Sequence, residues 1–228
     1  MLPISLAFAS AMTHWTPAAL AFGLAFLYFA NLYAYLDHTQ PFWYHFRAVS
    51  PYRHQLVHFR EWLHLNLYAL RNIILAYLAG LALYTLRFTL FVTDTNADLS
   101  LLDLTNLLIC YPLGSELFGV LHWLVHRNPT INHLVHSLHH SYHKPIALVG
   151  LYASILEMFL INIPLGVLPP LIMNLSPIGT RLYTALLALY ISTNHSGHQL
   201  VPLWLIDVSY HDIHHRRATE NYGSIFLE

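Results

Sequence analysis

The segment PAALAFGLAFLYFANLYAYL, residues 17–36, runs for twenty residues without a charged side chain. A helix rises about 1.5 Å per residue, so this segment is long enough to cross the roughly 30 Å hydrocarbon core of a bilayer. Similar apolar segments run from Asn72 to Val92 and from Leu107 to Val125. The sequence therefore predicts a protein with several membrane-spanning helices.

A fourth apolar stretch, Ile146 to Leu175, contains three prolines and is followed by a shorter apolar run over residues 182–191. The pair predicts a helical hairpin that either crosses the membrane or enters it part-way, since neighbouring helices can satisfy carbonyls that proline leaves free. We expect an all-α, multi-pass membrane protein with four or five membrane helices and a cytoplasmic histidine-rich cap. Residues 1–228 are expected to form a single membrane domain.

Composition supports this interpretation and excludes other classes. The chain has 228 residues, of which 56% are hydrophobic and only 9% charged, against about 25% charged in soluble domains. The formal net charge is −1, so no basic surface is available to bind nucleic acid. One cysteine, Cys110, excludes an intrachain disulfide and a thiolate metal site.

The basic residues predict the orientation. Arg47, Arg53 and Arg60 follow the first apolar segment, whereas residues 93–106 contain three aspartates and no lysine or arginine. Positively charged loops stay in the cytoplasm, so we expect the first loop to be cytoplasmic. Alternation of the spans then places every histidine-rich segment on the same cytoplasmic face.

Histidine is the unusual component, with eighteen residues in the chain. Ten of them occur in four groups, HWLVH, HSLHH, NHSGH and HDIHH, which contain His122, His126, His136, His139, His140, His195, His198, His211, His214 and His215. On a helix, positions i, i+3 and i+4 lie within an arc of about 100°, so each HxxHH unit is expected to direct three rings at one point. Neutral imidazole binds iron, zinc and copper, and ten histidines exceed the ligands that one zinc or haem iron takes. We therefore expect two metal ions.

Other interpretations of the titratable residues are weaker or stay open. A carboxylate-bridged diiron site needs two ExxH units, and Glu61 to His64 is the only one. A metal transporter or a membrane cytochrome would place its histidines within the spans, whereas these groups lie at span ends. Glu116 and Glu157 lie in apolar segments and are either functional or hydrogen-bonded between helices. We interpret the first six histidines of the chain as polar groups at the membrane interface: His14, His38, His45, His54, His58 and His64. Two others, His133 and His143, either orient a metal ligand or have no role in the site.

The order HxxxH, HxxHH, a third histidine group and a final HxxHH followed by Asn221-Tyr222-Gly223 resembles the fatty acid hydroxylase and sterol desaturase superfamily. The resemblance covers about residues 107–228. It implies a non-haem centre of two iron ions held by the ten histidines, with supporting roles for Glu116, Ser196, Asn221 and Tyr222. The chain departs from the family at Trp123, where arginine is common. It also ends soon after Asn-Tyr-Gly, as expected of a compact member or a fragment.

The resemblance also implies a function. Such enzymes use O2 and two electrons to hydroxylate or desaturate sterol-type or fatty-acyl lipids, as in sterol biosynthesis. No flavin, haem or iron–sulfur motif is present, so we expect a separate electron donor of the cytochrome b5 or ferredoxin type. Residues 194–198 are similar to the His-Ser-Gly segment of 4-methylsterol monooxygenases and cholesterol 25-hydroxylase, which favours hydroxylation over a sterol C-5 type desaturation. The expected location is the endoplasmic reticulum in a eukaryote or the inner membrane in a bacterium.

Overall fold

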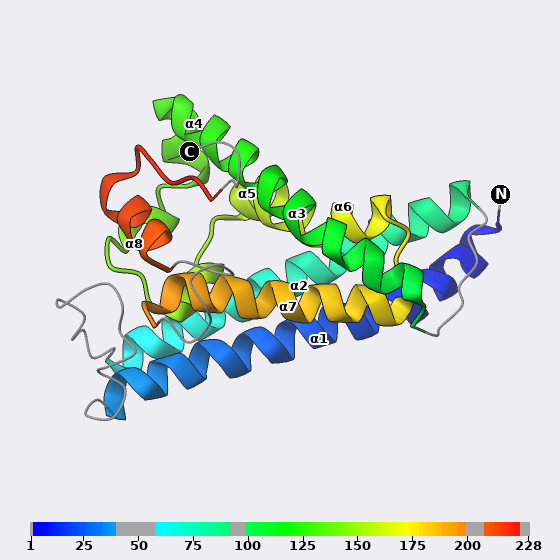
Figure 1. The fold of residues 1–228 in the computed structure, drawn as a ribbon, viewed down its shortest axis with the longest axis horizontal. Helices are drawn as coiled ribbons and strands as arrows, with labels where there is room; N and C mark the ends of the chain where they lie inside the picture. Colours follow the sequence, from blue (N-terminus) through cyan, green and yellow to red (C-terminus); the bar gives the residue numbers. More distant parts are fainter. Residues whose placement is uncertain (1, 40–57, 92–98, 199–207, 224–228) are drawn as a thin grey trace.

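The computed structural model describes residues 2–39, 58–91, 99–198 and 208–223. Within these ranges the regular structure is entirely helical, which confirms the predicted all-α fold class (Figure 1). Arg47 and Arg53, on which the predicted orientation partly rests, lie outside the described residues. The elements are α1 (Ile4–Thr39), α2 (Phe59–Leu90), α3 (Leu101–Arg127), α4 (Pro129–Val135), η2 (His139–Ser141), η3 (Ala147–Leu151), α5 (Ile155–Glu157), η4 (Met158–Asn162), α6 (Ile163–Ile172), α7 (Pro177–Ser196) and α8 (Val208–Arg217).

Four helical segments are long and apolar enough to cross a membrane: Ile4–Asp37, Phe59–Leu90, Leu101–Arg127 and Ile155–Ile172. The first and third contain the predicted spans 17–36 and Leu107–Val125, and the second contains residues 72–90 of the span predicted from Asn72 to Val92. The fourth lies in the first arm of the predicted hairpin. Their outer faces carry exposed apolar side chains at helical spacing, such as Leu63, Leu67, Leu70, Ile74 and Leu78 on α2. Lipid chains are the natural cover for such a face, so we describe the chain as a multi-pass membrane protein.

The second arm of the hairpin, α7, has twenty residues and is longer than the apolar run that predicted it. Most of its side chains are buried, and α1 packs along both α7 and α2 (Figure 1). The α7 helix begins with Pro177 at its first turn and with the Ser176 hydroxyl accepting the backbone N–H of Gly179 at 3.1 Å. The helix is therefore an internal element that supports the site at its far end.

One carboxylate joins the starts of α3 and α7. Asp103 forms a capping box with Ser100 at the first turn of α3, and its Oδ1 accepts the backbone N–H of Ser176 at 2.8 Å. Hydrogen bonds from three backbone and hydroxyl donors stabilise the charged form of a buried carboxylate. Because α3 is inclined to α7, the two helices separate toward the other end, where α8 lies between them (Figure 1).

Gly80 allows α1 and α2 to approach closely. A Cβ atom at this position would overlap the indole ring of Trp15, which also stacks on Tyr84 with 5.3 Å between ring centroids. The Trp15 indole N–H donates to the backbone carbonyl of Tyr77 at 2.9 Å, which fixes the ring in place. The indole therefore has no room to move away from a larger side chain.

We expect Gly80→Ala to destabilise the protein by about 1–3 kcal/mol, because the added methyl group overpacks the α1 and α2 contact. Gly166→Ala is the matched control, since its Cβ would meet only Leu187 Cδ2 at an ordinary 3.9 Å. That control should be neutral or stabilising, because alanine favours the helix over glycine. Thermal unfolding in detergent compares the two, and equal melting temperatures would contradict the close approach.

Candidate metal centre

The histidine groups meet at one end of the helical bundle. The last turns of α3 and α7 reach this end, and α4, η2 and α8 lie beside them (Figure 1). Nine of the ten candidate ligands come together there in two sets. Within each set, the ligand atoms all lie within 4.8 Å of one another. The first set is His122, His126, His136, His140 and His214, and the second set is His139, His195, His211 and His215.

Each HxxHH unit supplies both sets, so the expectation that its three rings point to one place is wrong. His136 and His140 join the first set, whereas His139 between them joins the second. This unit does not have helical spacing, since His136 is the C-cap of α4 and residues 139–141 form a 3-10 turn. In α8, which is helical, His214 contacts the first set and its neighbours at i−3 and i+1 contact the second.

Backbone carbonyls orient the rings of both sets. Nδ1 of His122 lies 2.9 Å from the carbonyl of Tyr222, and Nδ1 of His214 lies 2.8 Å from that of Glu220. In the second set, Nδ1 of His195 lies 2.8 Å from the carbonyl of Ile191. A carbonyl only accepts, so each Nδ1 carries the proton and the neutral ring presents an unprotonated Nε2 to the centre.

These Nε2 atoms face one another at short distances. The Nε2 atoms of His122 and His136 are 2.8 Å apart, as are those of His195 and His211. Where the ring orientation leaves a lone pair on each of two facing nitrogens, the two lone pairs repel each other unless a cation lies between them. The donor set therefore fits a metal ion in each group, and it is made of imidazole, which suits iron, zinc and copper.

Burial keeps these rings neutral. Desolvation, followed by the neighbouring ring of His214, lowers the pKa of His140 to about 3, and desolvation lowers the pKa of His214 to about 4. Burial likewise holds the pKa of His139, His211 and His215 well below the usual value. At neutral pH the imidazoles are therefore in the form that binds metals, and no proton has to be displaced from them.

Glu157 lies directly behind the first set. It is 3% exposed, and its Oε1 is 2.9 Å from Nδ1 of His136, whose Nε2 faces the centre. With His136 and His139 it forms a third group capable of binding a metal ion. Glu116, the other carboxylate in an apolar segment, is half-buried on α3 and belongs to none of these groups.

His198 is the candidate ligand that lies outside both sets. Its Nε2 is 3.0 Å from Oδ1 of Asp37, and its ring stacks on Tyr33 with 5.8 Å between centroids. It follows Gly197, whose φ of 71° ends α7 in the left-handed conformation and turns the chain away from His195. His198 therefore connects this end of α7 to α1.

The predicted supporting residues lie at different distances from the rings. Tyr222 contributes the carbonyl that orients His122, whereas the Ser196 hydroxyl bonds to Thr193 and to the backbone of His198. Asn221 is in the left-handed conformation, with φ 59°, in the turn before Tyr222. Sequence reasoning missed Asn132, whose amide nitrogen lies 2.8 Å from Nδ1 of His126, because a lone asparagine outside a motif carries no signal.

The remaining histidines lie away from the two sets. His14 is buried near the start of α1, with its Nε2 3.0 Å from the Thr180 hydroxyl, so it is not an exposed interfacial group. His58, His64, His133 and His143 are exposed. His45 and His54, together with the side chain of His38, lie outside the described residues.

Comparison with known proteins places this site in a family. A family model described as "Fatty acid hydroxylase" matches residues 108–227, just over half of the chain and every histidine of the two sets. The chain belongs to the fatty acid hydroxylase family. Two curated relatives in the family are named fatty acid hydroxylase domain-containing protein 2, one from Macaca fascicularis and one from Homo sapiens. Each is 28% identical over 120 residues, 53% of this chain.

The matched stretch spans only 35% of the length of either fatty acid hydroxylase relative. No solved structure matches the chain. The family model covers the segment that contains all four histidine groups. The superfamily resemblance drawn from the histidine motifs is thereby confirmed.

Proposed function

We propose that the protein is a membrane non-haem diiron oxygenase that hydroxylates a sterol-type or fatty-acyl lipid, with O2 and two electrons. The observation that carries the proposal is the division of nine histidines into two adjacent sets with facing ring nitrogens. The fatty acid hydroxylase family match supports a lipid substrate, and the imidazole donor sets suit iron. Two bound irons would supply the O2 activation that an unactivated C–H bond requires and that side chains alone do not provide.

The protein itself contributes ligand placement. The last turns of α3 and α7 hold His122 and His195, and carbonyl groups fix the direction of both rings. Burial of the ligands excludes bulk water, which keeps the site at low dielectric and limits side reactions. Glu157 orients His136 from behind and keeps its Nε2 directed at the first set.

The substrate and the electron donor reach the site from different directions in this proposal. The lipid enters from the bilayer between helices, because the histidine sets lie where the apolar helices end. A separate donor of the cytochrome b5 or ferredoxin type delivers the electrons. We propose that the histidine end faces the cytoplasm, with the protein in the endoplasmic reticulum of a eukaryote or the inner membrane of a bacterium.

Lipid extracts of a host that expresses the chain under 18O2 test the proposal. We expect a product that contains one 18O atom and is absent from cells that carry the empty vector. A product that lacks two hydrogens and carries no label would instead identify a desaturase with the same site. Metal flux into liposomes without any lipid product would identify a transporter.

Purified protein loaded with iron should be inactive with lipid and O2 alone and should turn over when a reduced donor protein is added. The physical reason is that each O2 consumed requires two electrons beyond those of the C–H bond, and the chain has no flavin, haem or iron–sulfur motif. Oxygen uptake coupled to product formation measures this. Repeated turnover without any donor would contradict the proposal.

A further inference from the structure

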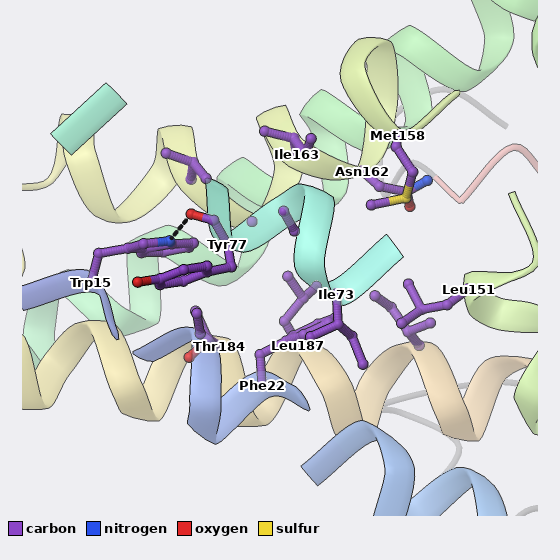
Figure 2. Close-up of a pocket in the computed structure, with 15 residues that line it drawn as sticks. Trp15, Phe22, Ile73, Tyr77, Leu151, Met158, Asn162, Ile163, Thr184 and Leu187 are labelled. Atoms are coloured by element: carbon purple, nitrogen blue, oxygen red, sulfur yellow. Dashed lines mark hydrogen bonds between the residues drawn. The ribbon is translucent and has the colours of Figure 1, made fainter. Parts of the chain in front are cut away.

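An elongated apolar cavity lies between α1, α2, α6 and α7 (Figure 2). It contains about 500 Å³ of space free of atoms, part of it open to the surroundings. Trp15 and Tyr77 close one end, and Leu151, Met158 and Asn162 line the other. Its walls are almost entirely hydrocarbon, so its occupant must be apolar over most of its length.

The cavity extends away from the metal centre along α7. Its α7 lining residues Ile191, Leu187 and Thr184 precede His195 by 4, 8 and 11 residues, so they lie about 6 to 16 Å from it along the helix. Ile191 and Asn162 also line a second, smaller pocket, whose other walls include the ligands His136, His139, His195 and His211. The two spaces therefore share a boundary at Ile191 and Asn162.

Asn162 faces this boundary because the chain forms a π-helical turn there. In an α-helix, Glu157 and Asn162 would be about 140° apart. The η4 turn instead has the i to i+5 hydrogen bond from Ile163 N–H to the Met158 carbonyl, and Glu157 and Asn162 both line the metal-facing pocket. Such turns are frequent at functional sites. The result is an amide group between an apolar cavity and the metal ligands.

Resting on the proposed function, we propose that this cavity binds a linear fatty-acyl chain, with the polar end of the substrate hydrogen-bonded to Asn162. The lining residues of α1 run from Trp15 to Phe22 and those of α7 from Thr184 to Ile191, so apolar walls follow the helix axes for about 10 Å, and a methylene chain laid along these axes would contact both. The amide then places the carbons next to the polar end beside the histidine sets. Asn162 is in this scheme a positioning residue.

Gly166 sets the depth of the cavity. It lies nine residues after Glu157, and the nearest atom to a Cβ placed on it is Leu187 Cδ2 at 3.9 Å. A larger side chain at this position therefore enters the cavity without first displacing the backbone or a neighbouring ring. Because glycine leaves the space open, the far end of the cavity is available to long chains.

A competing apolar pocket lies between α3, α6 and α7, lined by Leu107, Tyr111 and Leu186 among others. Its boundary with the metal-facing pocket consists of Phe118, Leu165 and Tyr190, and the Tyr190 hydroxyl there is already hydrogen-bonded to Asn194. The Tyr183 hydroxyl in its wall is already bonded to the Leu165 carbonyl at 2.8 Å. The cavity in Figure 2 is therefore the better site for the acyl chain.

Photolabelling tests the binding mode without requiring turnover. A saturated fatty acid with a diazirine at its methyl end, added to the iron-loaded protein in detergent, should label residues near Trp15, Tyr77 and Thr184. Gly166→Leu should reduce this labelling at least tenfold, in line with the selectivity of apolar pockets for single methylenes, and Gly166→Ala should retain most of it. Labelling near Asn162 by the same probe would reverse the proposed direction of the chain and overturn the role of the amide.

Asn162→Leu keeps the approximate size of the side chain but removes the hydrogen bond. We expect the variant to bind the fatty acid probe about fivefold more weakly, with unchanged affinity for an alkane of equal length. Equal weakening for acid and alkane would indicate a merely structural role and overturn the assignment. The iron content of each variant, measured in parallel, should match the wild type.

Four other outcomes also decide between the binding modes. Labels at Leu107, Tyr111 or Leu186 would move the chain to the competing pocket, and equal labelling by a sterol diazirine at Trp15 would overturn the preference for a linear chain. Gly166-dependent labelling in a protein that forms no 18O product would support the cavity and refute the proposed oxygenase. An 18O product formed without labelling in the cavity would overturn this inference alone.

Discussion

Replacement of His139 or of His214 by alanine is expected to reduce bound iron from two ions per chain to about one and to lower product formation at least 100-fold. The two residues come from different HxxHH units and belong to different sets, so each variant should lose the ion of a different set. Loss of a direct ligand should cost more than the 10- to 100-fold typical of residues that only orient a ligand. Elemental analysis and 18O2 product assays on purified protein measure both effects.

His133→Ala is the matched control, because His133 is exposed and lies outside both sets. It should keep the iron content and activity of the wild type. A His139→Ala protein that folds and forms product at the wild-type rate would refute the metal assignment. Thermal unfolding of each variant without added metal separates loss of the ligand from loss of the fold.

Glu157→Leu is expected to weaken iron binding about 10- to 100-fold while it leaves the protein folded. The carboxylate lies 2.9 Å from Nδ1 of His136 and is buried, so its removal frees the ring to rotate or to change tautomer. Competition with a chelator gives the affinity, and the optical spectrum of the metal-loaded protein reports the ligand geometry.

Two further variants make this result specific. Glu157→Gln keeps a polar partner for His136 and should recover part of the affinity. Glu116→Gln changes a carboxylate that lies outside the histidine sets and should have no effect on iron binding. Equal iron affinity in the wild type and in Glu157→Leu would show that Glu157 serves packing alone.

Much of the fold follows from the sequence because lipid imposes a simple rule. Long apolar segments must form helices there, and the predicted segments that begin at Pro17, Asn72 and Leu107 coincide with parts of α1, α2 and α3, the second as far as residue 90. The second arm of the hairpin was less predictable. Arg181 and several polar residues reduce the hydropathy of α7 between its caps at Ser176 and Gly197, and the packing of α7 against α1 does not show in a hydropathy pattern.

The sequence predicts which residues form the candidate site but not how they are arranged in space. Spacing alone singled out nine histidines that the structure brings together, since clustered imidazoles indicate metal binding. The assignment of His139 and His214 to separate sets depends on a local 3-10 turn and on the packing of α8, and residue spacing alone reveals neither. The π-helical turn that places Asn162 beside the ligands also has no sequence signal.

The division of both HxxHH units between the two sets has a consequence for how the site is assembled. Neither set is complete without α8, because α8 donates to both, and among the described elements α8 comes last along the chain. The other elements supply six of the nine imidazoles. Docking of this one helix therefore completes both sets at once.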